Sequence, residues 1–249
     1  MTRVKNNILY YSPGSTFSNV GLLLIHEKGL EDQFEFKAIK LGQDNISPWY
    51  IQLNPKGQVP TMIYQSNVVS DSLSIARFLD PCVQPPSFEC DNQKVMDFVK
   101  PWRQLRLLPL FAGKKDLDQD MSTMESTLAK ARAQQLAHAK AHPDLAESYE
   151  IRLGVHNERA EMLLEYDQFL FHRHMLNRLL DEAEKALDTN DGHLLSIKQH
   201  TLADIYVMAN LYCAHQKISS DILVNRSKLK EYYQQQMARP SVAKAFLLA

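Results

Sequence analysis

The sequence predicts two domains: an α+β N-terminal domain with the element order βαβαββα, and an all-helical domain after it. Short apolar or alternating segments of the kind that form strands occur only before residue 80, and beyond residue 90 the apolar residues recur at helical spacing. A proline-rich segment over residues 81–90 separates the halves, because proline disfavours helix. With 249 residues, 45% of them hydrophobic, the chain can bury two ordinary cores. We expect domains over residues 1–83 and 88–249.

The first half alternates strand and helix patterns. Apolar positions at helical spacing lead to Gly29, a typical helix stop, and the residues after it alternate like a half-buried strand. The elements expected here are strands 7–11, 34–39, 61–64 and 68–69, a helix over 16–29, a short helix or loop at 48–51, and a helix over 73–79. This order is typical of a thioredoxin-like domain.

The second half has no convincing strand pattern. The helices expected there are 94–111, interrupted by its two prolines, then 121–141, rich in strong helix formers, then the amphipathic run 157–187, and a last one after Thr201. Residues Thr201-Leu202-Ala203-Asp204 form a capping box, in which two side chains cap each other's backbone amides before an apolar run.

Two motifs in the first half suit a peptide-like ligand. In Gln58-Val59-Pro60 the proline opens a strand, and an X–Pro bond is the one peptide bond whose cis form costs little. A cis bond here would turn the Val59 backbone N–H and C=O toward solvent, ready to pair with an extended peptide. Ser70-Asp71-Ser72 then opens a helix, and the free amides of a helix N-terminus favour a carboxylate.

Together, residues 53–61 and 68–80 resemble the glutathione-binding half of a glutathione transferase. The Thr201 capping box and the turn at Arg239-Pro240-Ser241 extend the resemblance over nearly all of the chain. It implies the glutathione transferase fold, glutathione as co-substrate, a small hydrophobic electrophile as second substrate, and a homodimer.

The resemblance also implies roles for individual residues. The glutathione-binding set is Asn45, Gln58, Val59, Pro60, Asp71 and Ser72, and the second-substrate pocket is Phe17, Trp102, Arg103, Arg106 and Leu110. Asn45 falls where relatives place a His or Asn that contacts the glycyl carboxylate of glutathione. Relatives often add a Lys beside it, but Ile46 stands there, so Lys40 or Arg106 would have to compensate.

A thiol must lose its proton before it attacks, so an activating enzyme needs a hydrogen-bond donor to the thiolate, preferably at a helix N-terminus. When the Leu9-Tyr10 dipeptide is aligned with the same dipeptide of serine-type transferases, Ser15 falls at the position of their catalytic serine. Ser18 is the alternative if the register of the loop differs. Tyr10 is expected in the core. No cysteine precedes Cys82, which argues against thiol-transfer chemistry.

Within the family, the chain most resembles the tetrachlorohydroquinone dehalogenases and the ganglioside-induced differentiation-associated proteins, with residues 114–156 as their helical insertion. Phe17 stands where the dehalogenase has a cysteine, which puts reductive dehalogenation in doubt. Three alternatives stay open: a non-catalytic glutathione- or ligand-binding protein, a glutathione-dependent isomerase, and an ether-cleaving enzyme.

Composition narrows the function classes further. A formal net charge of −1 gives no reason to expect nucleic-acid binding, and no apolar run is long enough to span a bilayer. The start of the chain has no leader pattern, and three unpaired-looking cysteines suit a reducing compartment, so a cytoplasmic protein is expected. No metal is expected, because His172 and His174 would diverge on a helix and residues 116–120 lack the features of a calcium loop.

Overall fold

The computed structural model describes residues 7–83 and 86–249. Residues 1–6, where no leader pattern was found, and residues 84 and 85 of the expected linker lie outside the described part. The strands are β1 (Asn7–Tyr11), β2 (Phe34–Ala38), β3 (Thr61–Tyr64) and β4 (Asn67–Ser70). The helices are α1 (Thr16–Glu27), α2 (Pro48–Leu53), α3 (Ser72–Cys82), α4 (Gln93–Gln104), α5 (Leu108–Ala112), α6 (Ser122–Ala141), α7 (Ala146–Leu164), α8 (Tyr166–Thr189), α9 (Leu202–Lys217), α10 (Ser227–Met237) and α11 (Pro240–Phe246).

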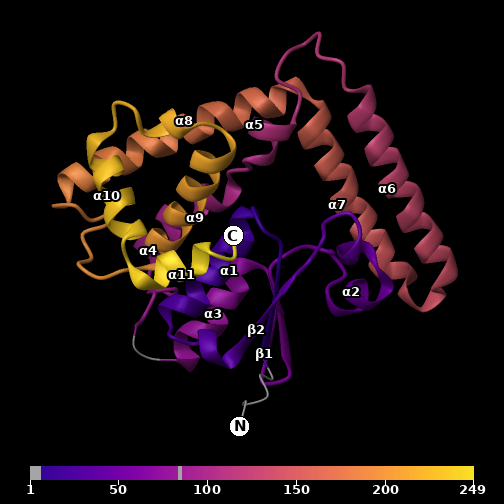
Figure 1. The fold of residues 1–249 in the computed structure, drawn as a ribbon, viewed down its shortest axis with the longest axis horizontal. Coiled ribbons are helices and arrows are strands. Elements are labelled where there is room, and N and C mark those ends of the chain that lie inside the picture. The colour runs from indigo at the N-terminus through magenta and orange to yellow at the C-terminus, as the bar shows by residue number, and fades with distance from the viewer. Residues whose placement is uncertain (1–6, 84–85) are drawn as a thin grey trace.

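The four described strands form one mixed sheet in the order β2-β1-β3-β4. Strand β1 runs parallel to β2 and antiparallel to β3, which also pairs antiparallel with β4. Helix α1 connects the two parallel strands, and α3 follows the hairpin (Figure 1). The predicted βαβαββα domain and the all-helical part after it are therefore confirmed.

Two boundaries differ from the prediction. The run expected as one helix over 157–187 is two helices, α7 and α8, because Glu165 between them takes an extended conformation (φ −92°, ψ 123°) and the chain turns there. Helix α3 continues through Pro81 to Cys82, so the linker begins later than expected. The interruption within 94–111 is confirmed, since α4 ends at Gln104 and α5 begins at Leu108.

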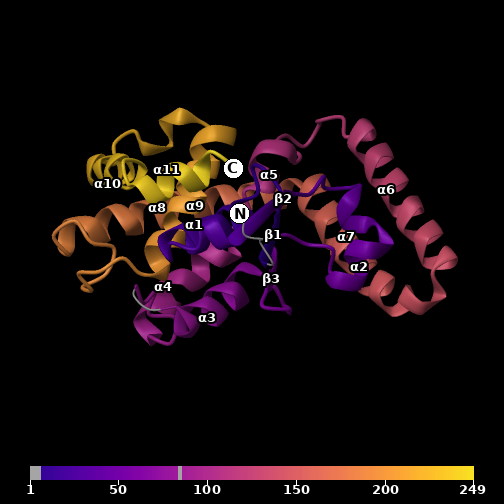
Figure 2. The same cartoon turned by 60° about the horizontal axis from the view of Figure 1, so that its bottom comes forward.

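Helices α6 and α7 form an arm whose outer helix, α6, lies away from α9, α10 and α11 (Figures 1 and 2). Its inner helix α7 packs against α2 of the N-terminal domain. There the buried Tyr149 hydroxyl donates to the carbonyl oxygen of Ile46 at 3.0 Å. The arm thus reaches the sheet domain from the side opposite to α9.

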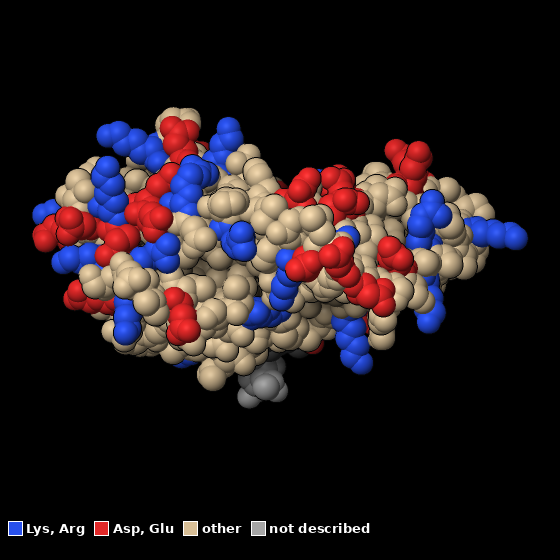
Figure 3. All heavy atoms as spheres, turned by 90° about the horizontal axis from the view of Figure 1, so that it is seen from above, with Lys and Arg blue, Asp and Glu red and all other residues tan. Residues whose placement is uncertain are grey.

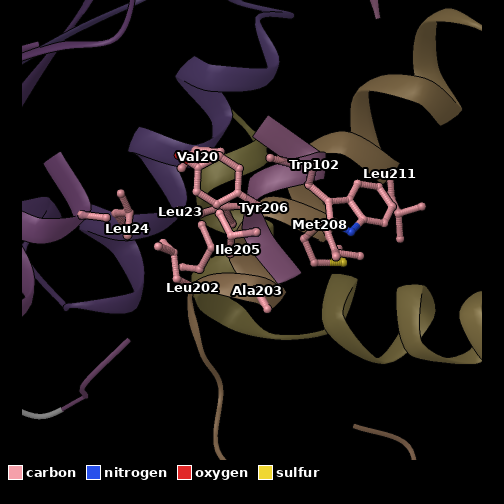
Figure 4. Close-up of a cluster of buried hydrophobic side chains, with 14 of the residues drawn as sticks. Val20, Leu23, Leu24, Trp102, Leu202, Ala203, Ile205, Tyr206, Met208 and Leu211 are labelled. Atoms are coloured by element: carbon pink, nitrogen blue, oxygen red, sulfur yellow. The ribbon is translucent and has the colours of Figure 1, made fainter. Parts of the chain in front are cut away.

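The two domains share one apolar core, with α9 at its centre. Val20 and Leu23 of α1 lie beside Ile205 and Tyr206 of α9 (Figure 4), and these side chains are almost fully buried. The capping box predicted at the start of α9 is present, and the Asp204 carboxylate also accepts a 2.7 Å hydrogen bond from Tyr232. Burial of these apolar side chains between α1 and α9 fixes the two domains relative to each other.

The predicted Arg239-Pro240-Ser241 turn anchors the end of the chain to α1. Glu27, at the last residue of α1, accepts hydrogen bonds from the Arg239 guanidinium and from the Ser241 hydroxyl. Because the Glu27 side chain is only 5% exposed, this ion pair is screened little by solvent.

A buried ion pair stabilises the segment that connects the two domains. The Lys28 Nζ lies 3.1 Å from the Asp80 carboxylate and also donates to the Val83 carbonyl at 2.6 Å. Burial alone would raise the pKa of Asp80, but hydrogen bonds from the backbone N–H groups of Phe88 and Cys90 and from Lys28 lower it. The Asp80 carboxylate therefore stays charged and binds both Lys28, which follows α1, and the backbone of Phe88 and Cys90, which precede α4.

Among the described residues, no helix combines the length and apolar character needed to cross a bilayer.

Replacing Lys28 by Met should lower the free energy of unfolding by about 3 kcal/mol, because Asp80 would remain buried without its cation. Equilibrium unfolding in urea measures the change. Lys37→Met is the matched control, since Lys37 pairs with Glu35 between side chains that are 41% and 49% exposed, and should cost less than about 1 kcal/mol. Equal urea midpoints for Lys28→Met and the wild type would contradict the role of the buried pair.

Candidate functional site

A cavity of about 550 Å³ opens where the loop before α1, the loop before β3, the N-terminus of α3, helices α4 and α5, and the arm helix α7 meet. Ten of the residues predicted from the sequence line it, so segments far apart in the chain converge as expected. They are Ser15, Phe17, Asn45, Gln58, Val59, Pro60, Asp71, Ser72, Arg103 and Arg106.

Two predicted pocket residues lie elsewhere. Trp102 is 2% exposed and packs against α9 in the shared core (Figure 4), and Leu110 is 5% exposed in the same core. Both belong to the apolar face of their helices, which sequence spacing cannot distinguish from a cavity face. Lys40, one of two candidates for an added positive charge, is exposed and away from the cavity wall.

The loop before β3 presents a free backbone edge. The Val59–Pro60 bond is cis, as predicted. The Gln58 carbonyl oxygen accepts hydrogen bonds from the Tyr50 hydroxyl at 2.8 Å and from the Asn54 amide at 2.9 Å, which fix the loop. Among the described residues, none hydrogen-bonds to the Val59 backbone N–H or C=O. These two groups are available to an extended ligand.

The N-terminus of α3 adds a second polar wall. Asp71 is its N-cap, and its carboxylate accepts hydrogen bonds from the Leu73 N–H at 2.7 Å and from Arg103 at 3.4 Å. The Ser72 hydroxyl is buried and pairs with the Tyr206 hydroxyl at 2.8 Å, and the Ser72 backbone N–H lies at the free start of α3. A half-exposed carboxylate next to free amides suits a ligand that carries both an ammonium and a carboxylate.

The structure separates the two candidate serines. Ser15 is the N-cap of α1 on the cavity wall, where its Oγ accepts the Ser18 N–H at 3.4 Å. Ser18 is fully buried, and its Oγ accepts the Ser12 N–H at 3.0 Å. Tyr10, expected in the core, is half-buried and lies edge-on to Tyr50 outside the cavity.

Asn45 is a structural member of the wall. It is 3% exposed, its amide donates to the Gly57 carbonyl at 2.7 Å, and its Oδ1 accepts the Gly42 N–H at 2.6 Å. Gly57 has a φ of +56°, and a Cβ there would lie 2.4 Å from the Asn45 carbonyl and 2.6 Å from the Arg152 Cδ. Only glycine fits this contact, which brings Arg152 of the arm against the loop.

Sequence reasoning missed the wall that α7 supplies. Arg152, Val155, Arg159 and Met162 line the cavity at spacings of three and four residues, which places them on one face of the helix. That periodicity was visible in the sequence, but nothing there identified the cavity as the partner of this face. Glu158, which also lines the cavity, is the one acidic residue of α7 on the wall among those described.

These arginines are held in low-dielectric surroundings. Burial and the nearby Arg159 lower the pKa of Arg152 to about 10, and burial lowers the pKa of Arg159. The Nε and Nη1 atoms of Arg152 are buried and have no hydrogen-bond partner within residues 7–83 and 86–249. Burial and Arg103 lower the pKa of Arg106, against the opposing charge of Glu158. All three guanidiniums remain charged at neutral pH, and a buried donor without a partner favours an anionic ligand.

A neutral histidine supports the Arg106 backbone behind the cavity. The His172 Nδ1 accepts the Arg106 N–H at 3.2 Å. Burial and the positive charge of Arg106 lower the pKa of His172 to about 4. The ring is therefore uncharged at neutral pH, which the accepting role of Nδ1 requires.

The described residues offer neither a reactive thiol in the cavity nor a metal cluster. None of the three cysteines lines the cavity, and burial raises the pKa of both Cys90 and Cys213. No group of three or more His, Cys, Asp or Glu side chains within residues 7–83 and 86–249 could hold a metal ion. On the face drawn in Figure 3, acidic and basic side chains are intermingled, unlike the basic stripe of a nucleic-acid-binding surface.

Two protein-family models match the chain. The model for the glutathione S-transferase N-terminal domain matches residues 14–81, and the model for the glutathione S-transferase C-terminal domain matches residues 155–247. The chain belongs to the glutathione S-transferase family. The two matches leave out most of the arm, in keeping with an insertion. The family and the glutathione transferase fold predicted from the sequence are thereby confirmed.

The relatives agree with the predicted branch of the family. Glutathione S-transferase TCHQD of Arabidopsis thaliana is 24% identical over 95% of this chain and 88% of the relative. The tetrachloro-p-hydroquinone reductive dehalogenase of Sphingobium chlorophenolicum is 22% identical over 88% and 87%. Among solved structures, the β-etherase LigF of Sphingobium sp. strain SYK-6 matches over all of both chains with a TM-score of 0.66 at 20% identity, which shows a shared fold.

Acidification should destabilise the protein through His172. Unfolding returns its pKa from about 4 to the ordinary 6.5, so between these pH values the unfolded chain binds a proton that the folded chain does not, and stability falls as pH falls. From pH 7.5 to 5.0 the wild type should lose about 2 kcal/mol more than His172→Asn, whose oxygen can still accept the Arg106 N–H. Urea unfolding at both pH values measures this. The exposed His174→Asn is the control and should behave like the wild type; an equal loss in all three proteins would contradict a neutral His172.

Proposed function

We propose that this chain is a glutathione transferase that activates the thiol of glutathione and passes it to an electrophile. The observation that carries the proposal is that one cavity collects the free Val59 backbone, the N-terminus of α3 with Asp71, and the N-terminus of α1 with Ser15. In the reaction the sulfur–carbon bond forms, the leaving group departs with its electron pair, and the thiol proton goes to solvent. The homodimer implied by the resemblance and the cytoplasmic location expected from the composition stay predictions.

Each end of glutathione has a matching wall. The Val59 N–H and C=O would pair with the cysteinyl backbone, and Asp71 with the Ser72 N–H would hold the γ-glutamyl end. At the glycyl end the Asn45 amide is already bonded to Gly57, but the guanidinium of Arg152 lies against the same glycine with buried N–H groups that have no partner. We assign the glycyl carboxylate to Arg152 rather than to Lys40 or Arg106.

Ser15 is the proposed donor to the thiolate. Because its Oγ already accepts the Ser18 N–H, its hydroxyl hydrogen remains free to point into the cavity. A hydrogen bond to the charged form lowers a thiol pKa, which is about 8.5 without help, and the amides at the start of α1 act in the same direction.

The alternatives differ in what they require of Ser15. A non-catalytic binding protein needs the walls that hold glutathione but no thiolate donor, whereas an isomerase or an ether-cleaving enzyme needs both. The absence of cysteine among the described lining residues argues against chemistry through a protein–glutathione disulfide.

Ser15→Ala should raise the pKa of bound glutathione and lower kcat/KM for 1-chloro-2,4-dinitrobenzene about 10- to 100-fold, because a hydrogen bond to a charged group contributes about 1.5–3 kcal/mol. The ultraviolet absorbance of the thiolate, followed against pH, gives the thiol pKa directly. Ser18→Ala is the matched control and should leave that pKa unchanged. If the thiol pKa is the same in Ser15→Ala and the wild type, Ser15 is not the donor and the binding-protein alternative is favoured.

Calorimetric titration should separate the two ends of glutathione. Asp71→Asn should weaken glutathione and its glycyl monoethyl ester equally, by about tenfold, because it changes the γ-glutamyl end. Arg152→Met should weaken glutathione about tenfold but leave the ester unchanged, because the ester has no glycyl carboxylate. The exposed Asp97→Asn is the control. If the wild type binds no glutathione at millimolar concentration, the proposed function is withdrawn.

A further inference from the structure

The cavity carries more positive charge than glutathione can balance. Among the described residues its wall has six basic side chains, Lys56, Arg103, Arg106, Arg152, Arg159 and Lys217, against two acidic ones, Asp71 and Glu158. Glutathione in its thiolate form brings a net of about two negative charges, from two carboxylates, one thiolate and one ammonium. About two positive charges would remain inside a partly closed cavity, where they repel one another.

Arg159 is the basic residue of the wall whose charge we expect a further anion to balance. It makes no ion pair with any described carboxylate, including Glu158 on the same wall, and its positive charge acts on the guanidinium of Arg152. It lies seven residues, or about 10 Å, along α7 from Arg152. The contact that would neutralise it is therefore separate from the one assigned to the glycyl carboxylate.

Apolar side chains line the cavity on either side of Arg159 along α7. Val155 and Met162 flank it on the same helical face, and Phe111 and Leu108 of α5 line the same cavity. Across the cavity, the Arg106 guanidinium lies 5.0 Å from the centre of the Phe17 ring. A ligand that lies between these side chains meets apolar and aromatic faces as well as the guanidinium groups of Arg106 and Arg159.

We propose that the second substrate is an amphipathic organic acid, an electrophile with an apolar body and a carboxylate that Arg159 binds. A guanidinium offers a planar pair of N–H groups that matches the two oxygens of a carboxylate. The apolar body would lie against Phe17 and Met162. This proposal rests on the proposed function and extends it, since it names the class of molecule that receives the thiolate and adds a carboxylate to the small hydrophobic electrophile expected from the sequence.

Direct binding tests the acid site without any catalytic step. The probe is 3,5-dinitrobenzoate, with the uncharged 3,5-dinitrobenzamide as its matched partner, titrated by calorimetry with and without saturating S-methylglutathione. The wild type should bind the acid at least tenfold more tightly than the amide, and Arg159→Gln should abolish this preference. Arg159→Lys, which keeps the charge, should retain part of it. Arg178→Gln, at an exposed position on α8, is the control and should behave like the wild type.

Three results would overturn the proposal. One is equal binding of acid and amide by the wild type, and another is a preference that survives in Arg159→Gln. The third is loss of the acid when S-methylglutathione is added, because the acid would then occupy a glutathione carboxylate site. The titration without S-methylglutathione decides the matter even if glutathione itself does not bind, so failure of the acid site and failure of the proposed function are distinguishable.

A kinetic arm links the acid site to turnover. The substrates are 4-chloro-3,5-dinitrobenzoate and its methyl ester, each rate being divided by the uncatalysed rate with glutathione. The acid should have the higher kcat/KM by about tenfold, and Arg159→Gln should lower kcat/KM for the acid alone, mainly through KM. Equal losses for the acid and the ester would indicate a structural role for Arg159 and would overturn the proposal.

Discussion

The packing of α9 against α1 is the constraint on which the rest of the site depends. Besides its apolar contacts, α9 carries a stripe of polar side chains at spacings of four, three and four residues, which lie on one helical face. The contacts of this stripe are Tyr206 with Ser72 at the start of α3, Asn210 with the Trp102 carbonyl in α4, Cys213 with Asn19 in α1, and Lys217 with the Gly14 carbonyl before α1. One buried helix thus sets the positions of three walls of the cavity, and its own rigidity follows from nearly complete burial and a closed capping box.

The arm supplies the remaining wall by a different route. Its register on the N-terminal domain is set by Tyr149, which bonds to Ile46, and by the tight contact of Arg152 with Gly57. The polar contacts made through α9 do not reach these residues. The walls proposed to hold the thiol and the γ-glutamyl end therefore belong to the shared core, whereas the guanidinium-rich wall depends on how α7 docks against α2. Changes in the arm can alter which anions bind without disturbing the thiolate donor.

The sequence predicted the features that are determined locally. The cis Val59–Pro60 bond, the Asp71 N-cap and the Thr201 capping box each depend on a few adjacent residues, and all three are present. Trp102 was misplaced because a helix with an apolar face does not reveal whether core or cavity covers it. The extended conformation of Glu165, which splits the expected helix 157–187, has no local signal in the sequence. Arg159 was missed for the same reason, because its role depends on contacts between distant segments.

The excess of positive charge also bears on how the thiolate is stabilised. A hydrogen bond from Ser15 acts only at contact distance, whereas the field of the guanidinium groups extends over roughly the 8–10 Å Debye length in physiological salt, and further where the cavity excludes water. Both effects would favour the thiolate form of glutathione. Only the field of the guanidinium groups would also attract other anions in the cavity. An acidic substrate that approaches the thiolate would be repelled by it in a neutral cavity. The excess guanidinium charge would offset that repulsion, so the same charges that would lower the thiol pKa would also allow a second anion to bind beside the thiolate.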